Sequence, residues 1–169
     1  MEYCNIEDAK DIVAIKYANA MNNLNLRNKG FIMPKIVWRD MGVHRAGYCD
    51  YTHNEIHLNI NYLKSKSWKD FLEDTPLHEL AHAISWQLYD ATGHKEVWKS
   101  VCYSLGLRGN RCHNFERPEG VNVTKRKRKR YSAHCPCREH IITSVKYNRM
   151  LKGIRYICVK CHGDLKIGE

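Results

Sequence analysis

The stretch His78-Glu79-Leu80-Ala81-His82 limits what this chain can fold into more than any other part of it. Residues four positions apart lie on the same side of an α-helix, with Cβ atoms about 5–6 Å apart. Two imidazoles at that spacing can reach one zinc ion, and Glu79 is then placed to accept a proton from a zinc-bound water. The pattern therefore predicts a helix that carries a hydrolytic Zn²⁺ site.

His94 is the candidate for the third protein ligand, which a catalytic zinc needs if one coordination position is to remain open for water. It follows Gly93, where we expect the motif helix to end, because glycine favours the left-handed conformation after a helix. Two acidic residues, Asp90 and Glu96, are the rivals for this position. His94 could also serve only as the cap of a following helix, which we expect over residues 95–105.

Helical patterns also precede the zinc motif. Apolar residues at spacings of three and four predict an amphipathic helix over residues 6–26, with Asn5 as its cap. Residues 68–73 are helical in pattern as well. Pro76 then predicts that a helix begins or kinks just before the zinc motif, because proline suits the first helical turn.

A period of two replaces the helical period in the region between these helices. Residues 36–39 predict a short strand, and residues 47–51 and 55–60 predict a hairpin. Apolar and polar residues alternate in the second strand of this hairpin, so we expect one buried face and one solvated face. His57 lies on the polar face, and we expect it to be a surface residue rather than a metal ligand.

Eight cysteines are many for 169 residues, and without a recognisable export signal closely spaced cysteines favour metal ligation over disulfides. Four of them form two close pairs near the C-terminus: Cys135 and Cys137, and Cys158 and Cys161. Residues 141–147 and 154–158 have strand-like patterns. Two cysteine knuckles on such a hairpin predict a zinc ribbon, in which four thiolates bind one structural zinc. Because the first pair is spaced Cys-x-Cys, one of three histidines could replace a thiolate: His134, His140 or His162.

The positive charge is concentrated at the C-terminal end. Residues 1–120 contain 15 Lys and Arg against 15 Asp and Glu, whereas residues 121–169 contain 13 against 3. This asymmetry predicts a neutral catalytic body joined to an end that binds a polyanion. We therefore expect a domain over residues 1–124, a basic linker over residues 125–130 and a small subdomain over residues 131–169.

Nucleic acid is one polyanion that this end could bind, since aromatic rings can stack on bases while cations follow the phosphates. The candidate contacts in the linker are six consecutive cations: Lys125, Arg126, Lys127, Arg128, Lys129 and Arg130. Those in the subdomain combine cations with tyrosines: Arg138, Lys146, Tyr147, Arg149, Arg155 and Tyr156. The plainer alternatives are a solvated, flexible linker and tyrosines that pack in a β-sheet.

No apolar run approaches the roughly 18 residues of a membrane span, and residues 1–10 lack an apolar signal segment. We therefore expect a cytoplasmic protein that does not contact a membrane and that associates with the nucleoid in a prokaryotic or phage-infected cell. We also expect it to act as a monomer. A role of the basic run in nuclear import would apply only in a host that has a nucleus.

Taken in order, these motifs resemble the SprT family of zinc metalloproteases, which includes Spartan. The resemblance covers nearly the whole chain and rests on three segments: Ala46 to Asn59, His78 to Trp98, and Cys135 to Leu165. It implies an α+β fold, with a zincin-like helical metalloprotease core, a small antiparallel sheet and a C-terminal zinc-ribbon β subdomain. Pro76, just before the first zinc-binding histidine, departs from the family pattern.

The resemblance also implies a protease that acts on DNA-bound or DNA-crosslinked proteins and is gated by DNA, with single-stranded DNA as a partner. In that mechanism His78, His82 and His94 hold a catalytic zinc and Glu79 is the general base, while a second zinc is structural. The alternative is a zinc-containing DNA-binding regulatory protein without protease activity. Glu79 argues against it, because a structural site needs no base beside its ligands. A zinc hydrolase of non-protein amides is a third possibility.

Overall fold

The computed structural model describes residues 3–112, 114–118, 120–121 and 129–168. The chain divides into two units, Met1–Val123 and Thr124–Glu169, each with its own hydrophobic core. Residues 125–128 of the expected basic linker lie outside the described residues. Arg130, the last residue expected in that linker, is the first residue of a strand in the second unit.

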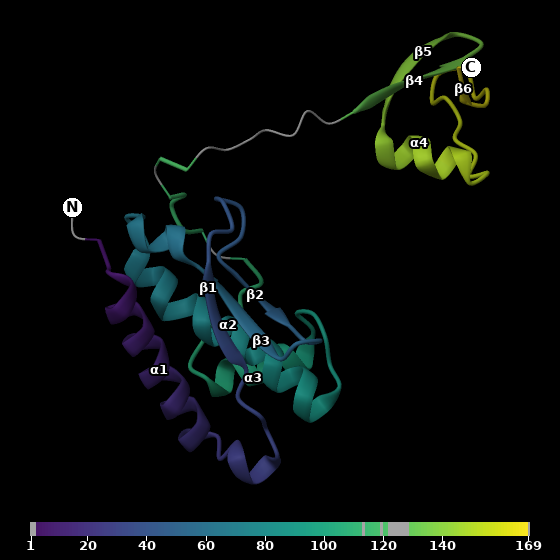
Figure 1. Cartoon of the computed structure of the whole chain (residues 1–169). Coiled ribbons are helices and arrows are strands. Elements are labelled where there is room, and N and C mark those ends of the chain that lie inside the picture. The colour runs from purple at the N-terminus through teal and green to yellow at the C-terminus, as the bar shows by residue number, and fades with distance from the viewer. Residues whose placement is uncertain (1–2, 113, 119, 122–128, 169) are drawn as a thin grey trace. The chain divides into compact units, whose positions relative to one another are not determined.

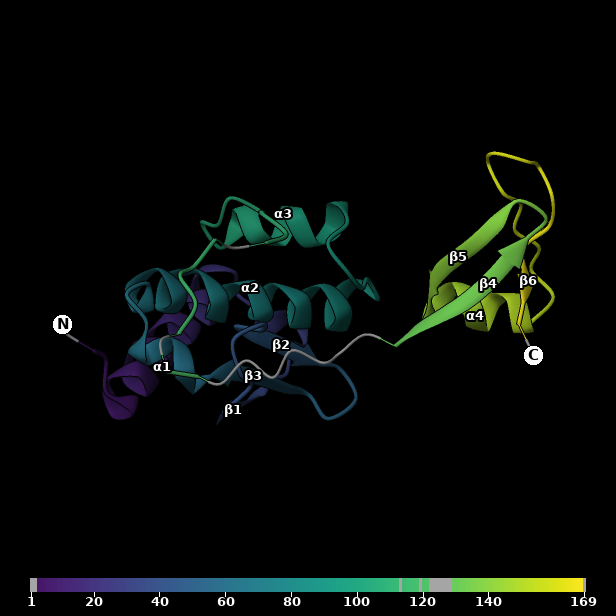
Figure 2. The same cartoon turned by 90° about the horizontal axis from the view of Figure 1, so that it is seen from above.

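The first unit is built around one long helix, α2 (Trp68–Tyr89). Its other helices and strands are, in chain order, α1 (Ile6–Asn23), β1 (Lys35–Arg39), β2 (Gly47–Asp50), β3 (Glu55–Asn59) and α3 (Glu96–Ser104), with short 3₁₀ turns at Arg27–Lys29 and Ile60–Lys64 (Figure 1). Figure 2 shows α2 lying between the sheet and α3. Since α2 is covered on more than one side, consecutive residues of its second half are buried, including Leu80, Ala81 and Ala83. None of the helices that the structure describes is long and apolar enough to cross a membrane.

α1 begins where the sequence predicts and ends three residues early. The side chain of Asn5 accepts a hydrogen bond from the backbone N–H of Asp8, which satisfies one free donor at the start of the helix. The buried stripe of α1 consists of Ala9, Val13, Tyr17, Ala20 and Met21. The chain leaves the helix before Asn25, which adopts a left-handed conformation with φ 50°. The expected continuation to residue 26 is therefore wrong.

The sheet of the first unit is mixed, with strand order β1-β3-β2. β2 and β3 form the expected antiparallel hairpin, but β1 pairs with β3 in parallel, so the expectation of an antiparallel sheet is wrong for β1. The register places Ile36 beside Ile56 and Trp38 beside Leu58, on the face that packs into the core. Alternation in the sequence marks that face, but it does not fix the direction in which a more distant strand pairs.

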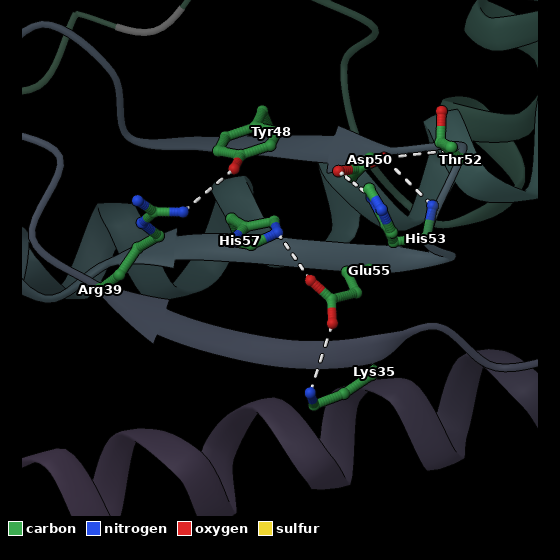
Figure 3. A network of polar contacts seen from close by, with 8 residues as sticks. All are labelled: Lys35, Arg39, Tyr48, Asp50, Thr52, His53, Glu55 and His57. Atoms are coloured by element: carbon green, nitrogen blue, oxygen red, sulfur yellow. Dashed lines mark hydrogen bonds and ion pairs between the residues drawn. The ribbon is translucent and has the colours of Figure 1, made fainter.

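The opposite face of the sheet is less exposed than the alternation predicts (Figure 3). His57 is only 5% exposed, because the ring of Tyr48 on the neighbouring strand stacks on it at 4.3 Å with an interplanar angle of 4°. The Nε2 atom of His57 lies 3.0 Å from a carboxylate oxygen of Glu55, which also pairs with Lys35 at 3.3 Å. The expectation that His57 is a solvated surface residue is therefore wrong. Among the described residues it joins no cluster of metal ligands.

α2 is one continuous helix that includes Pro76, so residues 68–73 do not form a separate element. Proline removes one backbone hydrogen bond from a helix interior. Buried residues on both sides of Pro76 hold the helix in place despite that loss, and the hydroxyl group of Tyr17 donates a hydrogen bond to the Pro76 carbonyl oxygen at 2.9 Å. α2 ends earlier than expected, because Asp90 takes the left-handed position with φ 49°. Gly93, where the end was expected, lies in the loop before α3.

The second unit contains, among its described residues, β4 (Arg130–Cys135), β5 (Arg138–Thr143), α4 (Ser144–Leu151) and β6 (Lys166–Ile167). β4 pairs in antiparallel fashion with both β5 and β6. The buried core of this unit is small and consists of Ala133, Cys135, Ile142, Cys158 and Leu165. Two of these core residues are cysteines of the predicted zinc ribbon.

The hairpin expected between the two cysteine pairs is wrong. Residues 141–147, expected as its first strand, are divided between β5 and α4. Residues 154–158, expected as its second strand, form no regular strand and contribute an isolated bridge from Ile157 to Asp164. The hairpin of this unit instead precedes α4 and consists of β4 and β5.

Local capping and packing explain why α4 is a helix. The side chain of Thr143 accepts a hydrogen bond from the backbone N–H of Lys146 at the start, and Gly153, with φ 85°, follows its end. Tyr147 and Met150 lie one turn apart on α4 and pack against the small core. Residues 141–147, which run into α4, have a strand-like pattern, but such weak local preferences yield to tertiary packing.

Candidate metal centre and active site

α2 and the loop before α3 bring three histidines together. His78 and His82 lie one turn apart on α2, and the Nε2 atom of each is 3.1 Å from Nε2 of His94. The ligand atoms of all three lie within 4.8 Å of one another, so the group could hold one metal ion. Neither Asp90 nor Glu96, the two rivals of His94 for the third position, belongs to this group of described residues.

The indole ring of Trp98 packs against all three imidazoles. Its centroid is 4.8 Å from that of His78, 5.3 Å from that of His82 and 4.5 Å from that of His94. Trp98 belongs to α3 and is 1% exposed, so it supports the three rings from the core side. The helical pattern predicts that Trp98 is a core residue. Its contact with all three histidines depends on how α3 packs on α2, which the pattern does not determine.

Burial lowers the pKa of two of these imidazoles and so favours the neutral form, which is the form that binds a metal ion. Burial, together with the neighbouring rings of His78 and His94, lowers the pKa of His82 to about 3. Burial and then the charge of Arg111 lower the pKa of His94. Three imidazole nitrogen donors beside an open cleft fit a zinc ion, because catalytic zinc sites keep three protein ligands and one position for water.

The three histidines line a cleft of about 610 Å³ between β2 and α2. Its volume falls within the range of about 300–1,000 Å³ that is usual for ligand sites. β2 borders the cleft and is an edge strand, since it pairs with β3 on one side only. Charged residues also line the cleft: Arg45, Asp74 and Arg111. The cleft therefore offers an extended chain both a strand edge and charged groups close to the metal position.

Glu79 lines the same cleft and is only 7% exposed. Burial raises the pKa of its carboxyl group to about 8, although the charge of Arg45 and a hydrogen bond from the backbone N–H of Cys49 oppose this shift. A metal dication held by the three histidines would add positive charge and favour the ionised carboxylate. A carboxylate in this position can exchange a proton with a water molecule in the cleft.

Gly47 allows β2 to approach α2 closely beside this carboxylate. A Cβ atom at residue 47 would lie 2.9 Å from Cγ2 of Thr75, 3.0 Å from the carbonyl oxygen of His57 and 3.1 Å from Cγ of Glu79. The carbonyl oxygen of His57 belongs to the backbone of β3 and cannot easily move away. Gly47→Ala should therefore displace the side chains of Thr75 and Glu79. We expect it to lower the free energy of unfolding by about 1–3 kcal/mol. The proteolytic activity that the sequence motifs predict should also fall by more than the loss of folded protein explains.

Thermal unfolding and a cleavage assay well below the unfolding temperature separate these two effects of Gly47→Ala. Gly168→Ala is the matched control, since nothing lies within 4 Å of the Cβ position at residue 168. If Gly47→Ala cleaves at the wild-type rate while folded, the close approach of β2 does not position Glu79.

A second group of potential metal ligands lies in the second unit: Cys135, Cys137, Cys158 and Cys161. The Sγ atom of Cys137 is 3.4 Å from that of Cys135 and 3.8 Å from that of Cys158. The Sγ atom of Cys161 is 3.6 Å from that of Cys135. This arrangement is compatible with a zinc ribbon, and the four thiols could hold a second metal ion.

The surroundings of two of the four thiols, Cys158 and Cys135, favour the thiolate, whereas hydrogen bonds with Cys135 and then Cys161 raise the pKa of Cys137 to about 12. A hydrogen bond from the backbone N–H of Cys161 is the main cause that lowers the pKa of Cys158 to about 5. Burial raises the pKa of the Cys135 thiol. Hydrogen bonds oppose this effect and lower the pKa to about 7, and the main one is with Nε2 of His140 at 3.2 Å. Both shifts favour thiolates, the form that binds zinc. None of the three histidines considered as substitutes for a thiolate belongs to this group of described residues: His134, His140 and His162.

A known protein family also matches this sequence. The model of the SprT-like family matches residues 18–127, which include the three histidines and Glu79. The chain belongs to the SprT-like family. Membership supports a metalloprotease-type domain, and the three-histidine group is consistent with zinc binding by it.

Relatives within the SprT-like family align over most of their length. Protein SprT of Klebsiella pneumoniae subsp. pneumoniae is 32% identical over 155 residues, which cover 90% of this chain and 86% of the relative. Protein SprT of Pseudomonas putida is 31% identical over 140 residues, 80% of each chain. Protein SprT of Salmonella arizonae is 32% identical over 152 residues, 88% of this chain and 87% of the relative. No solved structure matches the chain significantly.

The residues of this SprT-like chain that are predicted to contact nucleic acid differ in their exposure to solvent and in their partners. Four cations of the basic run are outside the described residues: Lys125, Arg126, Lys127 and Arg128. Four further cations are exposed: Lys129, Arg130, Arg138 and Arg149. Arg155 is exposed as well, but it forms an ion pair with Asp164 at 2.7 Å. Exposed cations are thus available in the second unit, whether or not they contact phosphate.

The two tyrosines predicted to stack on bases also pack within the second unit. Tyr147 stacks on Tyr131, with centroids 4.0 Å apart and an interplanar angle of 13°. The ammonium group of Lys146 lies over the ring of Tyr156, 4.5 Å from its centroid. Both rings are half-buried and pack against the small core, so part of each is already in contact with protein.

Proposed function

We propose that this chain is a zinc-dependent metalloprotease that cleaves proteins bound or crosslinked to DNA, and that DNA stimulates it. One observation carries the proposal: the three-histidine group and the buried carboxyl group of Glu79 share one open cleft. A purely structural metal site needs neither a buried base nor an open side. Membership in the SprT-like family agrees with a metalloprotease-type domain.

Each group in the cleft has a role that follows from its position. His78, His82 and His94 would hold the zinc ion, which when bound polarises a carbonyl group and lowers the pKa of a water molecule. Glu79 accepts the proton of the attacking water and delivers it to the leaving nitrogen of the cleaved peptide bond. Trp98 keeps the three imidazoles packed together, and the cleft beside β2 receives the substrate chain.

The second unit would bring the enzyme to DNA. Residues 121–169 carry 13 Lys and Arg against 3 Asp and Glu. Four thiols would hold a structural zinc there, which a core of this size needs for its stability. Because bound cations release counterions from the phosphates, the logarithm of the affinity should fall with that of the salt concentration, by about 0.7 per phosphate contacted on a single strand.

The same basic unit favours a second candidate function, that of a zinc-containing DNA-binding regulatory protein without protease activity. The chain would then bind DNA and retain its metal ions, but it would not cleave a protein held on the DNA. The two functions therefore differ in one observable, which is the appearance of peptide fragments.

A cleavage assay on a DNA-binding protein separates the two candidates. The substrate is incubated in zinc-replete buffer with the wild-type chain, or with a variant whose cations at residues 125–130 are glutamines, each with and without single-stranded DNA. We expect DNA to accelerate cleavage by the wild type, and we expect the variant to lose this acceleration while it keeps the DNA-independent rate. If zinc-loaded wild-type chain binds DNA but cleaves nothing under any condition, the protease assignment is wrong and the regulatory function replaces it.

A further inference from the structure

Tyr51 lies beside the three-histidine group, and neither the zinc motif nor the family match assigns it a role. It directly follows β2 and lines the cleft. Its hydroxyl oxygen is 3.4 Å from Nδ1 of His82. Its ring packs on Trp86, which lies one helical turn after His82 on α2, with centroids 5.5 Å apart. Tyr51 is thus held against α2 by its ring while its hydroxyl group reaches a candidate metal ligand.

The orientation of His82 determines what the Tyr51 hydroxyl group can do. The Nε2 atom of His82 faces Nε2 of His94 at 3.1 Å, so it is the nitrogen whose lone pair would bind the metal ion. The neutral imidazole then carries its proton on Nδ1, which can donate a hydrogen bond to the Tyr51 oxygen. Trp98 stacks on His82 at 5.3 Å with an interplanar angle of 28°. This stacking limits the tilt of the imidazole but leaves its rotation within the ring plane to be fixed by another group.

We propose that Tyr51 is a positioning residue of the metal centre. Its hydroxyl oxygen accepts the Nδ1 hydrogen of His82 and thereby fixes both the tautomer and the in-plane orientation of this ligand. The inference rests on the proposed function, because it requires a metal ion at the three histidines. Removing the hydrogen-bond partner of a metal-bound histidine typically weakens metal binding by about 10–100-fold.

Tyr51→Phe is the test variant, because it removes the hydroxyl group and keeps the ring that packs on Trp86. Tyr89→Phe is the matched control, since Tyr89 also belongs to the α2 region but is exposed and outside the cleft. Zinc affinity of the full chain is measured by competition with a chelator. Cobalt is then exchanged into the three-histidine site, whose absorption spectrum lacks the near-ultraviolet sulfur-to-cobalt charge-transfer bands of a thiolate site. The unfolding temperature of the metal-free chain is recorded for each variant.

We expect Tyr51→Phe to weaken zinc binding at the histidines by about tenfold and to change the cobalt spectrum. Its metal-free unfolding temperature should stay close to that of the wild type, and Tyr89→Phe should match the wild type in all three measurements. Wild-type zinc affinity together with an unchanged cobalt spectrum in Tyr51→Phe would overturn the positioning role and leave the proposed function intact. Failure of the wild-type histidines to bind any metal would overturn both.

Discussion

Replacing Glu79 with glutamine is expected to lower the rate of peptide-bond cleavage by about 10²- to 10⁴-fold, which is the usual contribution of a general base. Glutamine has nearly the same shape, so it fits the buried position beside β2, but its amide cannot accept the proton of the attacking water. The three histidines are unchanged, so the zinc content should equal that of the wild type. Initial cleavage rates and bound zinc per chain are measured on the same preparation.

Glu73→Gln is the matched control for this variant. Glu73 lies on α2 as well, but its side chain is exposed and pairs with Lys16 at the surface. Such surface pairs contribute only about 0–1 kcal/mol, so the control should fold and cleave like the wild type. Wild-type cleavage by Glu79→Gln would mean that another group takes the proton. Loss of zinc together with activity would mean that Glu79 supports the metal site rather than the chemistry.

Replacing Cys158 with serine is expected to unfold the second unit and to leave the first unit folded. Cys158 is 1% exposed and belongs to both the small core and the four-thiol group. Structural zinc binding contributes about 10–16 kcal/mol in zinc-finger peptides, and a core this small cannot replace that contribution. Bound zinc should fall by about one ion per chain. Limited proteolysis should then degrade the region after residue 124 and leave a resistant fragment that contains the three histidines.

Cys4→Ser is the control for this second variant, because Cys4 lies in the first unit and outside both groups of potential metal ligands. It should retain the wild-type zinc content and the wild-type proteolysis pattern. A Cys158→Ser chain with undiminished zinc and a resistant second unit would show that the four-thiol group does not hold a structural ion.

The features that were predictable from the sequence are those that depend on local geometry. The spacing of His78 and His82 places both imidazoles on one side of any helix that contains them, whatever surrounds it. His94 reaches the other two histidines if the chain turns back after the helix. This turn occurs even though α2 ends at Tyr89 instead of Gly93. The short spacing within each cysteine knuckle likewise places its two thiols together, whereas the meeting of the two knuckles depends on the fold of the second unit.

The features that were not predictable depend on contacts between distant segments. Tyr51 reaches His82, and Gly47 admits β2 beside Glu79, only because the sheet packs on α2 in one particular register. Nothing in the alternation around His57 indicates that Tyr48 covers it. In the second unit, the strand-like pattern of residues 141–147 predicted a strand as far as Tyr147, whereas capping by Thr143 and packing on the small core start α4 at Ser144.

The groups that line the cleft come from different parts of the chain, and this affects how a purified preparation should be assayed. All three imidazoles come from the short segment between His78 and His94, whereas the setting of Glu79 comes from β2, about thirty residues earlier in the chain. A molecule whose sheet has detached would also lose the contact of Tyr51 with His82 and bind its metal ion more weakly, but in excess zinc it could retain the ion and still lack a positioned base. In any purified preparation, metal analysis then gives an upper limit on the number of competent molecules. Counting those molecules requires a titration with an inhibitor that contacts both the metal ion and Glu79.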